Sequence, residues 1–337
     1  MPITLKSSLA VPERVLEWLG RQGTRAIAAL VFIGIAVPPL GELLKPLVAE
    51  AIFLLLCISF MRVDMSALRH HLRRPVLVLA ATGWTTLTVP LIFGAGCLAG
   101  NLDANSPDLF LALMLQAVAS PMMAAPALAA LMGLDSTLVL ITLVTSTAMI
   151  PITAPLFAYA FLGSTLMLSP LALGLKLFAI LGASLCVATA TRLIVGEAAI
   201  KRRKEAIDGL NILVLFVFVA AVMGGVANSY STDPVKAVKL ALFAFTVFFA
   251  LLGATAWIFR GIGREGALAL GLMVSQRNMG LMLAATNGAL PDLVWLYFAL
   301  SQFPIYLSPL LLKPIVRRLT LPSRKDGLVV KQPVNAE

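Results

Sequence analysis

The sequence alternates between long apolar runs and short polar segments. Each apolar run is about 20 residues long, the length at which an α-helix crosses the hydrocarbon core of a bilayer. A transmembrane β-barrel would instead show short strands of alternating polarity, a pattern that this sequence lacks. The pattern therefore predicts an all-α polytopic membrane protein with ten transmembrane helices. The helices are expected at residues 24–41, 46–62, 75–99, 107–133, 136–160, 169–193, 207–228, 234–259, 266–289 and 293–312.

Composition and charge support this prediction and also indicate how the chain is oriented in the membrane. Of the 337 residues, 60% are hydrophobic and 12% are charged, about half the charged fraction of a soluble domain. If the N-terminal side is called inside, 21 of the 26 Lys and Arg residues fall in inside segments and three, Lys45, Lys236 and Lys239, in outside segments. Cytoplasmic loops carry this excess. We therefore expect a protein of the cell (inner) membrane with both termini cytoplasmic, whose basic loops meet membrane lipid and not nucleic acid.

Two stretches of the sequence suggest an internal repeat. Residues 111–135 and residues 268–292 both begin Leu-Ala-Leu and end in Asp, at an offset of 157 without a gap. Because the repeating unit would hold five helices, its second copy must enter the membrane inverted, a recurrent plan in transporters. The expected organisation is an amphipathic cytoplasmic segment (1–23), repeat 1 (24–160), an inverted repeat 2 (169–316) and a cytoplasmic tail (317–337).

The fourth and ninth predicted helices each contain a break near their middle. In the fourth, Ser120-Pro121 lies midway and Pro126 follows, and proline inside a helix removes a donor and clashes with the preceding turn. In the ninth, the aligned position falls within Gln276-Arg277-Asn278. A kinked but continuous fourth helix is the alternative reading of the two prolines.

Half-helices that restart near Met122 and near Met279 would place their N-termini at the membrane centre. Free N–H groups and partial positive charge make such termini sites for anions. Together with neighbouring polar side chains they define a candidate substrate site. Its residues are Arg277, Asn278, Gln276, Ser120, Pro121 and Gln116.

Arg277 is the most informative residue of this site. A central arginine costs about 2.5–3.5 kcal/mol on insertion scales, so it requires partners, yet the acidic residues all lie at or near predicted helix ends. Two interpretations stay open. Backbone carbonyls freed by the broken helices could accept from the guanidinium, or the countercharge could arrive with an anionic substrate.

Motifs around these breaks resemble a known family. Asn278, Gly280 and Leu281 form Asn-x-Gly-Leu in the ninth helix, and Asp135 is followed by a Ser-Thr pair and two prolines, at Ser146, Thr147, Pro151 and Pro155. With the ten-helix layout over residues 24–316, these motifs look like the bile acid:sodium symporter family. The resemblance implies a secondary transporter of organic anions driven by sodium.

The chain departs from that family at the positions that would bind sodium. Carried over from the resemblance, the first sodium site falls on Ala125, Pro126, Val139, Leu143 and Met273. None of these side chains supplies the oxygen ligands that hard cations need. A glutamine of the second site becomes Arg277, so a fixed guanidinium is expected to take the place of the mobile cation. A small shift of alignment would bring in the oxygens of Thr142, Thr145 or Ser146, which keeps sodium open as a partner.

The expected function is thus alternating-access transport of a small organic anion, possible without sodium. The alternatives are a sodium-coupled symporter of similar anions and, in a different class, a membrane sensor or ligand-binding protein. We expect no enzyme, cofactor or metal, because the helices offer no carboxylate pair or His set for catalysis and no P-loop. The three cysteines, Cys57, Cys97 and Cys186, are expected to be small core residues.

Overall fold

A computed structural model describes residues 13–22, 29, 33, 34, 36–62, 75–163 and 168–320. Almost all of these residues are helical, and no strand forms among them. The first half contains α2 (Pro38–Leu44), η1 (Lys45–Leu47), α3 (Val48–Arg62), α5 (Pro75–Gly83), η2 (Trp84–Thr88), α6 (Val89–Ala99), α7 (Leu102–Asn105), α8 (Pro107–Val118), α9 (Ala125–Met132), α10 (Ser136–Phe157) and η3 (Ala158–Leu162). The second half contains α11 (Pro170–Val195), α12 (Glu197–Arg202), α13 (Lys204–Thr232), α14 (Pro234–Ile258), η5 (Arg260–Ile262), α15 (Arg264–Ser275), α16 (Met279–Ala285) and α17 (Asp292–Thr320).

Seven helices in the described part of the chain are long and apolar enough to cross a membrane. They are Pro39–Arg62, Pro75–Ala99, Ser136–Leu162, Pro170–Val195, Lys204–Thr232, Pro234–Ile258 and Asp292–Leu319. Their ends follow local capping: the side chains of Asp135, Ser169 and Asp233 each accept from a backbone N–H in the first turn. The prediction of an all-α membrane protein is confirmed at this level.

The remaining predicted helices differ from these seven. Half of the predicted helix 24–41 lies outside the described residues, and its described end includes the start of α2. The expected loop before residue 46 is helical instead, because the single 3₁₀ turn η1 continues α2 into α3. The fourth and ninth predicted helices are each split into two short helices. The last helix runs on to Thr320, so the expected start of the tail at residue 317 is helical and residues 321–337 lie outside the description.

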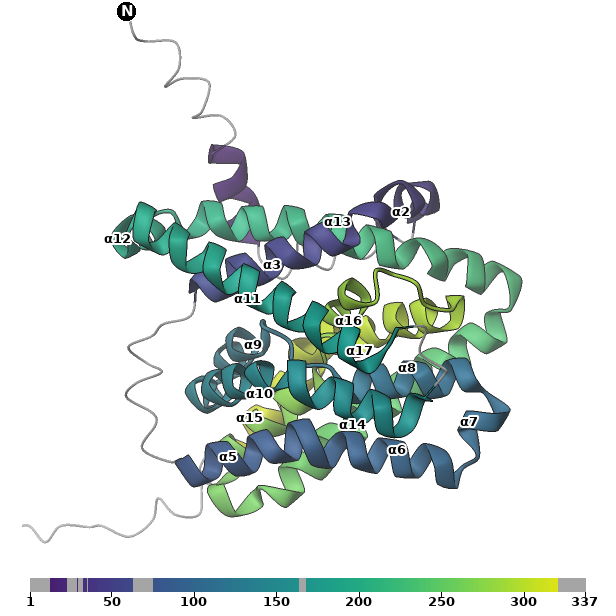
Figure 1. The fold of residues 1–337 in the computed structure, drawn as a ribbon. Helices are drawn as coiled ribbons and strands as arrows, with labels where there is room; N and C mark the ends of the chain where they lie inside the picture. Colours follow the sequence, from purple (N-terminus) through teal and green to yellow (C-terminus); the bar gives the residue numbers. More distant parts are fainter. Residues whose placement is uncertain are drawn as a thin grey trace, which may run out of the picture.

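Two sets of helices lie at opposite edges of the protein. In Figure 1, α2, α3 and α13 lie together along one edge, whereas α5 and α6 lie along the opposite edge. The short helices α8, α9, α15 and α16 fill the middle with α17. At Gly41 a Cβ would lie 2.6 Å from the Gly224 Cα, so α2 and α13 pack backbone against backbone, as small residues allow in membrane proteins.

The surface of the spans is apolar, as lipid contact requires. Large hydrophobic side chains such as Val76, Leu193 and Ile194 are about four-fifths exposed, which a soluble protein would not tolerate over whole helices. Cys57 and Cys97 are buried as expected, but Cys186 is exposed, so the prediction of three core cysteines is wrong for Cys186. That residue lies on a face of α11 that no other part of the described chain covers.

Candidate functional site

The fourth predicted helix is broken, not kinked. α8 ends at Val118, and Ala119 is extended, with φ −64° and ψ 150°. The chain resumes as α9 at Ala125, with Pro126 in its first turn. Proline is favourable there because its missing N–H would have no helical partner. This explains why α9 begins at Ala125 and not near Met122 as predicted.

The ninth predicted helix is broken at the expected place. α15 ends at Ser275 and Gln276 is extended. Asn278 then caps α16, its Oδ1 accepting from the Leu281 N–H at 3.3 Å. α16 has only seven residues, so its N-terminal dipole is small, and Asn278 already occupies one of its free donors.

The two breaks pair with each other. The Met122 N–H donates to the Gln276 oxygen at 2.7 Å, and the Asn278 N–H donates to the Ser120 oxygen at 2.7 Å. Pro121 and Arg277 stand opposite each other in this antiparallel bridge. Backbone groups released from a helix in lipid must find partners inside the protein. Each break therefore satisfies groups that the other exposes.

The guanidinium of Arg277 is anchored by backbone oxygens. Nη1 donates to the Ala119 oxygen at 3.0 Å and to the Thr85 oxygen at 3.2 Å, and Nη2 donates to the Thr85 oxygen at 3.3 Å. The Ala119 oxygen is free because α8 ends beside it. This agrees with the first of the two interpretations that the sequence left open, in which freed carbonyls accept from the arginine.

The second acceptor is free for a different reason. In the π-helical turn η2, the Val89 N–H bonds to the Trp84 oxygen, five residues back. In that register the next donor, which would serve Thr85, is residue 90. Residue 90 is proline, which has no N–H. Pro90 therefore leaves the Thr85 carbonyl available to Arg277.

The carbonyls hold the guanidinium without neutralising it. Arg277 is 2% exposed, and no described Asp or Glu forms an ion pair with it. Its Nε–H is buried without a hydrogen-bond partner. The hydroxyl of Tyr306 is likewise buried and unpartnered. Unsatisfied buried donors of this kind are rare and require an explanation.

Arg277 and Tyr306 line the same cavity, here called the crossing cavity. It measures about 150 Å³ and lies between α3 and α13 on one side and the paired breaks with α17 on the other. Most of its walls are apolar, and amide side chains add polar groups. The lining residues are Ile52, Leu55, Leu56, Ser59, Met122, Met123, Ala124, Leu128, Asn211, Leu215, Phe218, Arg277, Asn278, Met279, Gly280, Phe298, Gln302 and Tyr306.

The structure divides the six predicted site residues into two sets. Arg277 and Asn278 line the crossing cavity. Ser120, Pro121 and Gln276 form the paired breaks, and Gln276 Nε2 donates to Ser308 Oγ at 3.1 Å.

Gln116 has another partner, since the Tyr297 hydroxyl donates to its Oε1 at 2.5 Å. These four residues are not among those that line the crossing cavity. Their contacts make them supports of the crossing in this structure.

Sequence reasoning missed the wall formed by α3 and α13. Leu55, Leu215 and Phe218 look like ordinary membrane residues, and Ser59 and Asn211 are the polar residues that α3 and α13 contribute. Tyr306 was missed as well, because one tyrosine in a long helix gives no signal of an unpartnered hydroxyl.

Positions that the family resemblance assigned to sodium are packed with apolar groups. Ala125, Val139, Leu143 and Met273 belong to one buried hydrophobic cluster, and each is at most 1% exposed. None of these side chains carries an oxygen atom, so they supply no ligand for a hard cation.

The fold and the crossing define the protein at the level of its class: an all-helical membrane-embedded protein with two paired helix breaks beside a cavity. No protein-family model matches the chain, and no curated protein matches it either.

Proposed function

We propose that this protein is a secondary transporter of a small organic anion. The observation that carries the proposal is Arg277, a buried cation without a carboxylate partner in the described chain, which borders the crossing cavity. A buried charge is costly unless it is paired, and an anionic substrate would supply the pair.

Two unpartnered donors fit a carboxylate or similar group. The Nε–H of Arg277 and the hydroxyl of Tyr306 both belong to lining residues and both lack a partner. Hydrogen bonds to ionised groups are about twice as strong as neutral ones. The methionine and phenylalanine side chains of the cavity, Met122, Met123 and Phe218, favour an apolar or aromatic body on the same anion.

The architecture that we propose has ten spans in two inverted repeats of five. Its support is that Pro121 and Arg277, on opposite sides of the bridge, lie in segments that align between the predicted repeats. Alternating access would come from α2, α3 and α13 moving against the remaining helices around the crossing. We further propose the inner membrane with both termini cytoplasmic, on the basis of the Lys and Arg distribution.

Sodium-independent transport is the form that we favour. The apolar cluster at the resemblance-derived sodium positions supports it, and Arg277 would act as a tethered cation. One observation favours sodium coupling as the second candidate. The hydroxyls of Thr142, Ser146 and Thr147 on α10 are buried without hydrogen-bond partners and are oxygen atoms of the kind that sodium binds.

A thermal-shift screen on the purified protein tests the proposal. Benzoate and taurocholate, with benzamide as a neutral control, are compared on wild type and Arg277→Gln. We expect the anions to raise the melting temperature of wild type but not of Arg277→Gln, and benzamide to raise neither. Equal stabilisation of both proteins would mean that the arginine is purely structural. Binding without uptake into proteoliposomes would favour a membrane sensor or ligand-binding protein.

A further inference from the structure

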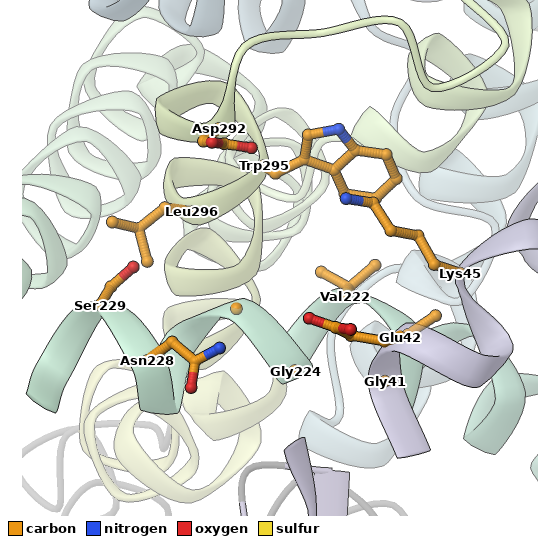
Figure 2. Close-up of a pocket in the computed structure, with 12 residues that line it drawn as sticks. Gly41, Glu42, Lys45, Val222, Gly224, Asn228, Ser229, Asp292, Trp295 and Leu296 are labelled. Carbon is orange, nitrogen blue, oxygen red and sulfur yellow. The ribbon is translucent and has the colours of Figure 1, made fainter. Parts of the chain in front are cut away.

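A second cavity is lined, like the crossing cavity, by residues of α13 and α17. This hollow, the mouth cavity, measures about 310 Å³ and is lined from α2, η1, α13 and α17. Figure 2 shows Glu42 and Lys45 on one wall, Asn228 and Ser229 on α13, and Asp292 and Trp295 on α17. The Lys45 ammonium lies 5.0 Å from the centre of the Trp295 ring. Its lining therefore mixes charged and polar side chains with apolar ones, and it is less apolar than that of the crossing cavity.

The two cavities follow each other along the same pair of helices. On α13, Leu215 and Phe218 line the crossing cavity, and Val222, one helical turn further, lines the mouth cavity. On α17 the order is reversed: Leu296 lines the mouth cavity and Phe298 the crossing cavity. Because α13 and α17 both change cavity at this level, the boundary between the two hollows lies there.

Two aromatic rings lie at that boundary. The rings of Phe218 and Phe298 are 5.8 Å apart between centroids and tilted by 55°, and both residues are buried. Phe218 also rests on the start of α16, where a Cβ on Gly280 would come within 3.3 Å of its ring. The ring of Phe218 therefore contacts both α17 and α16 and closes the space between them and α13.

We propose that Phe218 and Phe298 form the barrier between the crossing cavity and the mouth cavity, so that the two hollows are consecutive segments of one path. This rests on the proposed transport function, in which an anion bound near Arg277 leaves or enters past these rings. Opening the path requires the Phe218 ring on α13 to separate from the Phe298 ring on α17. Phe218 and Phe298 are thus positioning residues of the path and do not hold the anion charge.

Cysteine labelling tests the barrier without measuring transport. In a background with Cys57, Cys97 and Cys186 replaced by alanine, Ser59→Cys marks the crossing cavity and Ser229→Cys marks the mouth cavity. A membrane-impermeant methanethiosulfonate is added to the face of sealed vesicles on which Asp292 lies. We expect rapid reaction at Ser229→Cys and slow reaction at Ser59→Cys.

Removing either ring should open the path to the reagent. Phe218→Ala or Phe298→Ala is expected to speed the reaction of Ser59→Cys from the Asp292 face by about tenfold, the order of magnitude that loss of one aromatic pair gives. Phe249→Ala is the matched control, since Phe249 stacks with Phe245 within α14 and lines neither cavity. Phe218→Leu replaces Phe218→Ala if the alanine variant does not fold.

An unchanged rate in a folded Phe218 variant overturns the barrier, as does rapid reaction of Ser59→Cys from that face when both rings are present. The labelling result and the transport result are independent. Tenfold faster labelling without uptake of any anion would support the barrier and contradict the proposed function. Uptake without faster labelling would support the proposed function and contradict the barrier.

Discussion

Arg277 donates from Nη1 to the main-chain oxygen of Ala119 at 3.0 Å. This hydrogen bond ties the break in one helix to the break in another. The same guanidinium also reaches the Thr85 oxygen, which Pro90 leaves without a donor. Three irregular segments of backbone thus meet on one side chain, whose Nε–H has no hydrogen-bond partner among the described residues.

Replacing Arg277 with methionine should destabilise the fold. The Ala119 and Thr85 oxygens would lose their donor, and an unsatisfied buried group costs about 1–3 kcal/mol. Removal of a buried charge offsets part of this, so we expect the free energy of unfolding to fall by about 1–3 kcal/mol, measured by unfolding in detergent. Arg264→Gln at the start of α15 is the control, because Arg264 is exposed and donates to a single oxygen of Leu319.

Methylguanidinium provides a check on the cause. Its planar donors fit the vacated oxygens in Arg277→Ala, and it should restore part of the lost melting temperature, whereas sodium chloride at the same concentration should not. If Arg277→Met is as stable as Arg264→Gln, the anchoring that the structure shows contributes little.

Tyr306→Phe should weaken anion binding and leave stability unchanged. The Tyr306 hydroxyl has no hydrogen-bond partner to lose among the described residues, but a hydrogen bond to a charged ligand contributes about 1.5–3 kcal/mol. We therefore expect the Kd for the bound anion to rise by at least about tenfold in isothermal titration calorimetry. Tyr159→Phe is the matched control, since Tyr159 is largely exposed. An unaltered Kd in Tyr306→Phe would exclude the hydroxyl from the site.

The new carboxylate in Asn278→Asp should compete with the anionic substrate for the positive charge of Arg277. Aspartate and serine both cap helices about as well as asparagine, so α16 is expected to remain in place in Asn278→Asp and Asn278→Ser. Only aspartate adds a negative charge to the cavity that Arg277 borders. The anion-induced shift in melting temperature should survive in the serine variant and disappear in the aspartate variant. Similar shifts in both would show that charge balance does not control binding.

Pro90→Ala should weaken anion binding without lowering the stability of the fold. An alanine amide can bond to the Thr85 oxygen, which removes one of the two acceptors that orient Arg277. Because proline inside a helix costs about 3 kcal/mol, the variant should be at least as stable as wild type, yet give a smaller melting-temperature shift with benzoate. Pro314→Ala, also inside a helix but exposed, should not change the shift. A full shift in Pro90→Ala would mean that η2 does not orient the arginine.

The sequence predicted the breaks but left two kinds of partner for Arg277 open. Local chemistry was sufficient for the break in the fourth predicted helix, because Pro121 and Pro126 act on the backbone next to them, whereas the break in the ninth followed from the alignment of the two repeats. The carbonyl of Thr85 was not predictable, since its availability depends on Pro90 and on packing between residues 192 positions apart. The expected loop near Lys45 was wrong because a charged residue and a proline fit within the 3₁₀ turn of η1.

The cavity walls show a second limit of prediction from the sequence. Phe218 and Leu215 have the same apolar character as the lipid-facing residues of α13, and a transmembrane helix gives little amphipathic signal by which to tell the two faces apart. The predicted polar residue Asn278 does line the crossing cavity, whereas the predicted Gln116 accepts a hydrogen bond from Tyr297 and does not line it. Polar type alone did not distinguish a lining residue from a structural one.

The most direct test of Arg277 as the countercharge for a transported anion is uptake of radiolabelled benzoate and taurocholate into proteoliposomes in sodium-free buffer. Wild type and Arg277→Gln are compared at equal reconstitution. The account predicts uptake of at least one anion by wild type without sodium, unchanged when sodium is added, and loss of that uptake in Arg277→Gln. Uptake that requires sodium, or that persists in Arg277→Gln, would contradict it.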